Sequence, residues 1–234
     1  MLTIQILKAN GCNVIALDID ESRLKLAEKY GAQVFDLSKN ESVGNFINNN
    51  TNNLGVDKTI ITASSKSSDP ITLSSKITRK RGKIVLVGVA DIHFDRADLY
   101  EKEISFQVSC SYGPGRYDNN YEQNGVDYPE AYVRWTEKRN FDAVLNLMSQ
   151  KKIIVDDLLT EKYNFSDAEI AYDSLLKSKN LISILMLYET EEKVKNKNVI
   201  EFNKNEFDKL NPIITVVGSG NYAQRNIIPK LKKM

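Results

Sequence analysis

The sequence predicts an α/β fold with a parallel sheet, and three observations support this prediction. Short apolar runs rich in Val and Ile alternate with amphipathic segments of about ten residues, the arrangement expected of βαβ units. Glycine residues separate several of these segments, as expected where a helix ends. The length of 234 residues allows one or two domains, since a domain takes about 150 residues.

The alternation is clearest in residues 1–110. Met1–Asn10 is predicted as a helix that ends at Gly11, and a buried strand at Asn13–Asp18 follows it. The same pattern continues with a helix at Glu21–Tyr30, a strand at Gln33–Asp36, a helix at Glu41–Asn49, a strand at Lys58–Thr62, a helix that ends near Arg79–Gly82, and strands at Ile84–Val89 and Lys102–Cys110. Strands joined by helices in this way are expected to lie parallel in one sheet.

The pattern changes after the turn at Ser111–Gly115. An amphipathic helix is predicted at Phe141–Gln150, and short strands are predicted at Leu159–Tyr163 and Leu181–Tyr188. Between these strands, Ser166–Glu169 has the spacing of a capping box and predicts a helix that runs to Lys177.

A polar stretch, Glu189–Lys209, is predicted to be a linker, and a second buried strand is predicted at Ile213–Val217. The residues after this strand read G-x-G-x-x-A, which is a dinucleotide fingerprint in the expected context. In this fingerprint Gly218 permits a tight turn, and Gly220 lets a pyrophosphate approach the backbone. The predicted contacts of the turn with a nucleotide are made by Gly218, Gly220, Asn221 and Tyr222. A purely structural turn is the alternative, and only 14 residues follow Gly220, too few to reach the acidic residue expected about 20 positions further on.

Asp18 ends the first predicted strand, where a carboxylate accepts both hydroxyls of an adenosine ribose. Such a carboxylate repels a 2′-phosphate and therefore favours NAD over NADP. Arg23 follows five residues later and would soften that preference beside the ribose. The alternatives are that Asp18 caps the next helix, which Asp20 does equally well, and that Arg23 is a solvated helix charge.

The composition excludes several classes of function. The formal net charge is +1, so no overall field recruits nucleic acid or an anionic membrane. No apolar run approaches the roughly 18 residues of a membrane span, and the first residues lack a secretory signal, so a cytoplasmic protein is predicted. With two cysteines far apart and one histidine, the sequence cannot assemble a disulfide framework or a Cys/His zinc cluster.

Four stretches of residues 1–188 resemble the later part of a medium-chain, zinc-type alcohol dehydrogenase-like dehydrogenase. They are Leu7–Cys12, Val14–Asp20, Gly82–Val89 and Asn164–Ala168. Residues 211–233 resemble the opening of the glucose-fructose oxidoreductase/inositol dehydrogenase (Gfo/Idh/MocA) family. Both together, with the runs at 111–118 and 132–140, resemble a bi-domain oxidoreductase of bacterial surface-polysaccharide gene clusters.

The resemblance implies a Rossmann-type parallel sheet lacking its first strand, the α+β tail of a GroES-like catalytic domain, and the first βα unit of a second Rossmann domain. The implied division is a partial NAD(P)-binding domain at 1–112, a tail at 113–189, a linker at 190–210 and the second domain from 211 to 234. The expectation is a chain cut at both ends, with any zinc held by a domain outside it. The strand ends implied to line the adenine and nicotinamide sides of the cofactor are Thr62, Ala63, Val87, Gly88 and Val89.

The expected function is hydride transfer between NAD and a carbinol or carbonyl carbon, on a sugar or sugar nucleotide, with the isolated chain inactive or nearly so. The expected partner is a small-molecule substrate, and a homo-oligomer is left open. Two rivals are a non-catalytic nucleotide-binding module and a methyltransferase that uses S-adenosylmethionine. No catalytic residue is named, although three arginines beside two aromatic residues offer a clamp for a carboxylate or phosphate, with a structural loop as the favoured alternative: Arg116, Arg134, Arg139, Tyr132 and Trp135.

Overall fold

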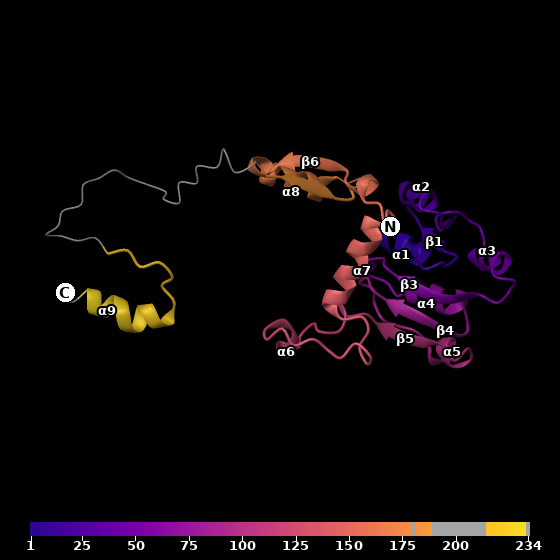
Figure 1. Cartoon of the computed structure of the whole chain (residues 1–234), viewed down its shortest axis with the longest axis horizontal. Helices are drawn as coiled ribbons and strands as arrows, with labels where there is room; N and C mark the ends of the chain where they lie inside the picture. The colour runs from indigo at the N-terminus through magenta and orange to yellow at the C-terminus, as the bar shows by residue number, and fades with distance from the viewer. Residues whose placement is uncertain (179–180, 189–213, 233–234) are drawn as a thin grey trace. The chain divides into compact units, whose positions relative to one another are not determined.

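The computed structural model describes residues 1–178, 181–188 and 214–232. The chain divides into two compact units, Met1–Thr160 and Glu161–Met234. Figure 1 shows the elements of both units, and each unit is described by itself below. The first unit extends past residue 112, and whether 1–112 and 113–189 differ in function stays a prediction.

The first part of the first unit follows the predicted alternation. Its elements are α1 (Leu2–Ala9), β1 (Ile15–Asp18), α2 (Glu21–Lys29), β2 (Gln33–Asp36) and α3 (Val43–Asn50). The strands β1 and β2 pair in parallel, with Ile15 opposite Gln33 and Asp18 opposite Asp36. The side chain of Asp20 caps α2 by accepting hydrogen bonds from the N–H groups of Ser22 and Arg23.

The second part of this unit holds a three-stranded sheet. Its elements are β3 (Val56–Ile61), α4 (Asp69–Ile77), β4 (Thr78–Leu86), α5 (Arg96–Tyr100) and β5 (Ser105–Val108). All three strands are parallel, in the order β3-β4-β5. A cluster of buried aliphatic side chains fills the space between strands and helices: Ile61, Ile71, Ile84, Leu86 and Ile104. The predicted parallel α/β architecture is therefore confirmed.

The division into a pair and a triplet of strands has a topological reason. A Rossmann sheet has the strand order 3-2-1-4-5-6, so its first strand lies between the second and the fourth. The pair β1-β2 and the triplet β3-β4-β5 correspond to strands 2 and 3 and to strands 4, 5 and 6 of that order, and among the described residues no strand joins the pair to the triplet.

The basic run at Arg79–Gly82 does not end a helix as predicted. The helix α4 ends at Ile77, and the run forms the first part of β4. The Nζ atom of Lys102 donates hydrogen bonds to the carbonyl oxygens of Ser75, Lys76 and Thr78 at 2.8–3.1 Å. These bonds satisfy carbonyls at the end of α4, so the helix stops there and β4 begins at once.

The rest of the first unit contains α6 (Asn119–Glu122), α7 (Glu137–Ser149) and the 3₁₀ turn η1 (Asp156–Leu158). The side chain of Gln5, 5% exposed, ties this part to α1. Its Nε2 donates to the carbonyl oxygen of Ile154 at 2.9 Å, and its Oε1 accepts from the N–H of Ile154 at 2.7 Å. The side-chain amide of Gln5 therefore satisfies both backbone polar groups of Ile154, as a neighbouring strand would.

The second unit begins with β6 (Glu161–Asn164), the 3₁₀ turn η2 (Phe165–Asp167), α8 (Ala168–Lys177) and β7 (Ile184–Leu187). The two strands pair in parallel, so both predicted strands are confirmed with shorter bounds. The predicted capping box does not form, because the hydroxyl of Ser166 donates to Asp167 and no side chain caps α8. The preceding 3₁₀ turn leads directly into the helix instead.

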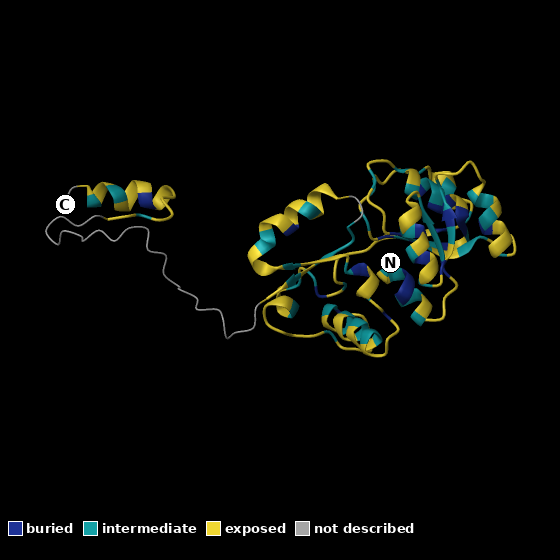
Figure 2. Ribbon diagram, turned by 90° about the horizontal axis from the view of Figure 1, so that it is seen from above, coloured by how far each residue is buried: buried dark blue, intermediate teal, exposed yellow. Residues whose placement is uncertain are grey.

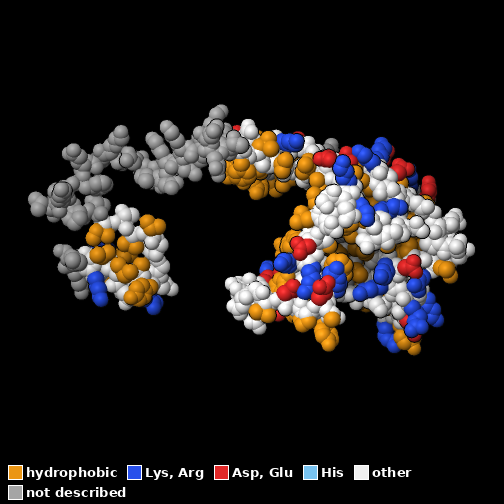
Figure 3. Space-filling view, in the orientation of Figure 1, with side chains coloured by type: hydrophobic (Ala, Val, Ile, Leu, Met, Phe, Trp, Pro, Cys, Tyr) orange, Lys and Arg blue, Asp and Glu red, His pale blue; other side chains and the backbone are white. Residues whose placement is uncertain are grey.

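The predicted strand at 213–217 is not formed in its described part, Ile214–Val217. The exposed fractions of Ile214 and Val217 are 60% and 93%, so no neighbouring strand among the described residues buries this apolar run. Figures 2 and 3 show this segment mostly exposed, with apolar side chains on its surface. A helical segment does follow the glycine turn, as predicted, in the form of η3 (Ala223–Ile227) and α9 (Ile228–Leu231). The predicted linker at 190–210 lies outside the described residues.

Candidate functional site

The carboxyl ends of the strands in the first unit gather most of the predicted site residues. Because β3 and β4 are parallel, the segments that follow them leave the sheet at the same edge. The N–H of Gly88 donates to the carbonyl oxygen of Ile61 at 2.9 Å, and the N–H of Ser65 donates to that of Val89 at 2.8 Å. Thr62 and Ala63 therefore lie beside the exit of β4, and this carboxyl edge is the candidate site.

Gly88 has a structural reason to be glycine. A Cβ atom at this position would lie 2.1 Å from the carbonyl oxygen of Ala63, far inside van der Waals contact. The close approach of the two backbones depends on the missing side chain. On either side of it, Val87 and Val89 are 54% and 74% exposed, so the edge presents apolar side chains to solvent.

Asp18 lies at the carboxyl end of β1, as predicted. Its Oδ1 accepts hydrogen bonds from the N–H of Ile19 at 2.7 Å and of Asp20 at 3.1 Å, which fixes the carboxylate at the strand end. Within the described residues, no hydrogen bond engages its Oδ2. Asp20, and not Asp18, caps α2, so the capping alternative for Asp18 is wrong.

Arg23 lies in the first turn of α2, three residues after the N-cap Asp20 and five after Asp18. Both charges act on the amino group of Met1, whose pKa is lowered first by burial and then by the charge of Arg23, while Asp18 opposes the shift. The charges of Arg23 and Asp18 therefore act in opposite directions on the group where α1 begins.

The second set of predicted contacts belongs to the second unit. Gly218 has φ of +82°, which confirms the tight turn that the sequence predicts. A Cβ atom on Gly218 or Gly220 would meet no atom within 4 Å, and Asn221 and Tyr222 are exposed. The turn therefore has the left-handed glycine of the fingerprint, and in the part of the chain that the structure describes no sheet surrounds it.

The residues that follow β5 also lie at this edge, although the sequence pattern did not single them out as site residues. Since β5 is parallel to β4, its exit lies at the same edge, and the N–H of Ser109 donates to the carbonyl oxygen of Leu86 at 2.8 Å. Ser109 and Cys110 are exposed there. Their position directly after a predicted parallel strand could have identified Ser109 and Cys110 as site residues, as the same position identified Gly88.

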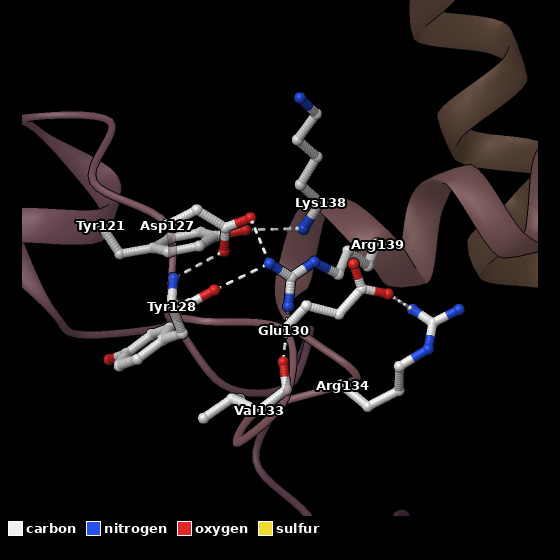
Figure 4. A network of polar contacts seen from close by, with 8 residues as sticks. All are labelled: Tyr121, Asp127, Tyr128, Glu130, Val133, Arg134, Lys138 and Arg139. Atoms are coloured by element: carbon white, nitrogen blue, oxygen red, sulfur yellow. Dashed lines mark hydrogen bonds and ion pairs between the residues drawn. The ribbon is translucent and has the colours of Figure 1, made fainter.

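The arginines that the sequence suggests as a ligand clamp instead form ion pairs and hydrogen bonds within the protein. Figure 4 shows Arg139, whose side chain is 17% exposed, donating to Asp127 and to the carbonyl oxygens of Tyr128 and Val133. Arg134 pairs with Glu130 at 3.3 Å and stacks on Trp135 at 4.5 Å.

Arg116 is also engaged. It pairs with Glu122 at 2.5 Å, and this contact raises the pKa of the guanidinium. The favoured alternative, a structural loop with surface charges, agrees with these contacts.

No metal site is found in the described part of the chain. No three His, Cys, Asp or Glu side chains among those residues lie close enough to hold an ion, and His93 is exposed in a loop. The residues described here therefore do not fit a zinc ion. In the same ranges, no helix is both long and apolar enough to cross a membrane.

Comparison with curated proteins finds relatives of low identity. D-arabitol-phosphate dehydrogenase of Enterococcus avium is 27% identical over 194 residues, which are 81% of this chain and 47% of that protein. A probable D-xylulose reductase A of Aspergillus fumigatus is 26% identical over 190 residues, 79% of this chain and 46% of that protein. The chain spans about half the length of these relatives.

Solved structures show the same fold. An alcohol dehydrogenase from Thermus sp. ATN1 matches with a TM-score of 0.61 at 17% identity, over 80% of this chain and 47% of that one. The 2R,3R-butanediol dehydrogenase of Bacillus subtilis matches with a TM-score of 0.60 at 24% identity, over 78% of this chain and 46% of that one. Residues 1–124, more than half of the chain, match the family described as zinc-binding dehydrogenase. The chain therefore belongs to the zinc-binding dehydrogenase family.

Proposed function

We propose that residues 1–160 bind and orient NAD for a dehydrogenase that transfers a hydride to or from a carbinol or carbonyl carbon of a sugar, sugar alcohol or sugar nucleotide. The observation that carries this proposal is the position of Asp18. Its carboxylate ends β1 with Oδ1 held by two backbone N–H groups, which leaves Oδ2 to accept hydrogen bonds from the hydroxyls of a ribose. The neighbouring strand ends supply the rest of the binding edge.

The substrate class rests on the relatives. Their names point to a phosphorylated sugar alcohol in one case and to a pentulose in the other. We extend this class to the present chain, whose own residues contribute binding and orientation. The nicotinamide, when bound, carries the hydride.

Cofactor selection follows from charge. A carboxylate at Asp18 opposes the 2′-phosphate of NADP, while Arg23 nearby moderates the preference. We therefore propose NAD as the preferred cofactor. Family membership favours a dehydrogenase over a methyltransferase, and the non-catalytic binding module is separated from it by an activity assay.

The glycine turn at Gly218–Gly220 is proposed to open a second nucleotide-binding unit of the Gfo/Idh/MocA type. Its sequence and the left-handed backbone of Gly218 support this proposal. A cytoplasmic location, the absence of nucleic-acid partners and a homo-oligomer remain predictions from the sequence.

The experiment is a titration of the whole chain with NADH, NADPH and S-adenosylmethionine. Asp18→Ala should weaken NADH binding about tenfold, because a charge-assisted pair of hydrogen bonds is lost. Asp36→Ala is the matched control, since Asp36 ends the neighbouring strand, where it accepts hydrogen bonds from Ser38 and pairs with Lys39 at 3.9 Å. Failure of the wild type to bind either nicotinamide, or equal effects of the two substitutions, would contradict the proposal.

A further inference from the structure

The loop that follows β5 leaves the sheet at the candidate cofactor edge and then takes an unusual path. Ser109 is still paired to β4 through the carbonyl oxygen of Leu86. Three residues later the backbone enters the left-handed region at Tyr112, with φ of +65°, and Gly113 and Gly115 also have positive φ, of +99° and +112°, which glycine adopts readily. A bulky residue such as tyrosine rarely adopts this conformation, so the surrounding structure must impose it.

The first turn of α7 imposes it. The Nδ2 atom of Asn140 donates a hydrogen bond to the carbonyl oxygen of Tyr112 at 2.8 Å. The next residue, Phe141, lies against the ring of Tyr112 with a centroid separation of 6.2 Å. The N–H of Glu137 donates to the carbonyl oxygen of Pro114 at 2.9 Å.

The contact is tight enough to restrict the sequence. A Cβ atom on Gly113 would lie 2.6 Å from Nδ2 of Asn140, so this glycine and this amide fit each other. Tyr112 also stacks with the guanidinium of Arg116 at 5.7 Å. The conformation of Tyr112 is therefore fixed by contacts to its carbonyl oxygen, to its ring and to the adjacent Gly113.

We infer that Asn140 is a positioning residue for the nicotinamide half of the dinucleotide, an inference that rests on the proposed function. By fixing the carbonyl of Tyr112, it sets the course of residues 109–112 beside the exit of β4. Ligands of open parallel sheets bind at the carboxyl ends of the strands, and strained backbone is common in segments that clamp a ligand. Asp18 ends a strand of the other sheet, so it serves the adenosine half.

The test separates the two halves of the cofactor. Asn140→Ala and Asn140→Asp both remove the donor, and Asn140→Asp also keeps the size of the side chain. Each should raise the Kd of NADH about fivefold and leave the Kd of AMP within twofold, because AMP contacts the adenosine half only. Asn146→Ala, on the same helix but bonded to Gln150, is the control and should change neither.

The only tryptophan supplies a second readout. The carbonyl oxygen of Trp135 lies 3.2 Å from the Cβ position of Gly113, so this residue is close to the strained loop. Energy transfer from Trp135 to bound NADH at saturation should fall in the Asn140 variants and stay unchanged in Asn146→Ala. A general loss of structure would weaken AMP and NADH alike.

The outcomes distinguish the two proposals. Wild-type binding of NADH with equal losses of NADH and AMP in both Asn140 variants, or with no loss of either, would overturn the inference and leave the proposed function standing. Absence of NADH binding to the wild type would overturn the proposed function, and the inference with it. A selective loss of NADH, with less energy transfer, supports both.

Discussion

Two apolar runs of this chain are alike in sequence and differ in structure. Residues 84–88 read Ile-Val-Leu-Val-Gly, and residues 214–218 read Ile-Thr-Val-Val-Gly. The first run passes through β4 between two parallel neighbours, and Ile84 is fully buried. The second forms no strand in its described residues, and Ile214 is 60% exposed. A β-branched run therefore indicates a strand only where other strands supply its hydrogen bonds and cover its side chains.

The glycines that end these runs differ in the same way. Gly88 allows two backbones to approach, whereas Gly218 has an unusual φ and empty space around it. One glycine is required by packing and the other by local turn geometry. Substitutions in the two runs should therefore have unequal effects on stability.

The largest difference is expected for the isoleucines. Ile84→Ala leaves a cavity in the buried cluster and should lower the free energy of unfolding by about 4 kcal/mol. Ile214→Ala should change it by less than about 0.5 kcal/mol, because the side chain is exposed. Urea unfolding followed by far-ultraviolet circular dichroism, which reports on the first unit and on the second, measures both. Similar losses in the two variants would mean that residues 214–217 are buried in solution.

The glycines provide the next test. Gly88→Ala should cost about 3 kcal/mol, because the added Cβ overlaps a backbone carbonyl that cannot move alone. Gly220→Ala is the matched control and should not destabilise the protein, since a Cβ there meets nothing within 4 Å. Thermal unfolding by circular dichroism compares them. A stable Gly88→Ala variant would show that the exits of β3 and β4 are further apart than described.

The smallest effect is expected at the end of the first unit. Gln5→Leu removes both hydrogen bonds to Ile154 and leaves two backbone groups without their partner, at a cost of about 2 kcal/mol. Hydrogen exchange should speed up at Ile154 before it changes in β4. Lys8→Leu, on the same helix, controls for the change in polarity. Unchanged exchange at Ile154 would place residues 151–158 outside the first unit.

Much of the fold follows from the sequence because it depends on local pattern. The parallel strands from Ile15 to Val108 and the cap at Asp20 were recognisable from apolar runs and turn residues. The end of α4 was not, because the ammonium that caps it comes from Lys102, more than 20 residues further along the chain. Non-local side-chain contacts of this kind leave no mark in a local pattern.

The residues of the candidate site also fall into those that a local pattern predicts and those that depend on non-local contacts. Asp18 and Gly88 could be predicted because they end strands, and a parallel sheet brings strand ends together. The hydrogen bond from Asn140 to the carbonyl oxygen of Tyr112 joins residues 28 positions apart. A contact over this separation cannot be predicted from local residue spacing. The contacts of the three arginines agree with the favoured interpretation of a structural loop, since their acidic partners lie in the same segment.

Lys102 has a consequence for the chemical reactivity of the protein. Its ammonium is occupied by three carbonyl oxygens, whereas the exposed Lys80 in the nearby basic run has no such shelter. Amine-directed reagents should therefore label Lys80 quickly and Lys102 slowly. Acylation of Lys102 requires its three hydrogen bonds at the junction of α4 and β4 to break. The neutral amide that forms cannot make the same three hydrogen bonds again. The rate at which this one amine reacts would therefore report how often the three-stranded sheet opens.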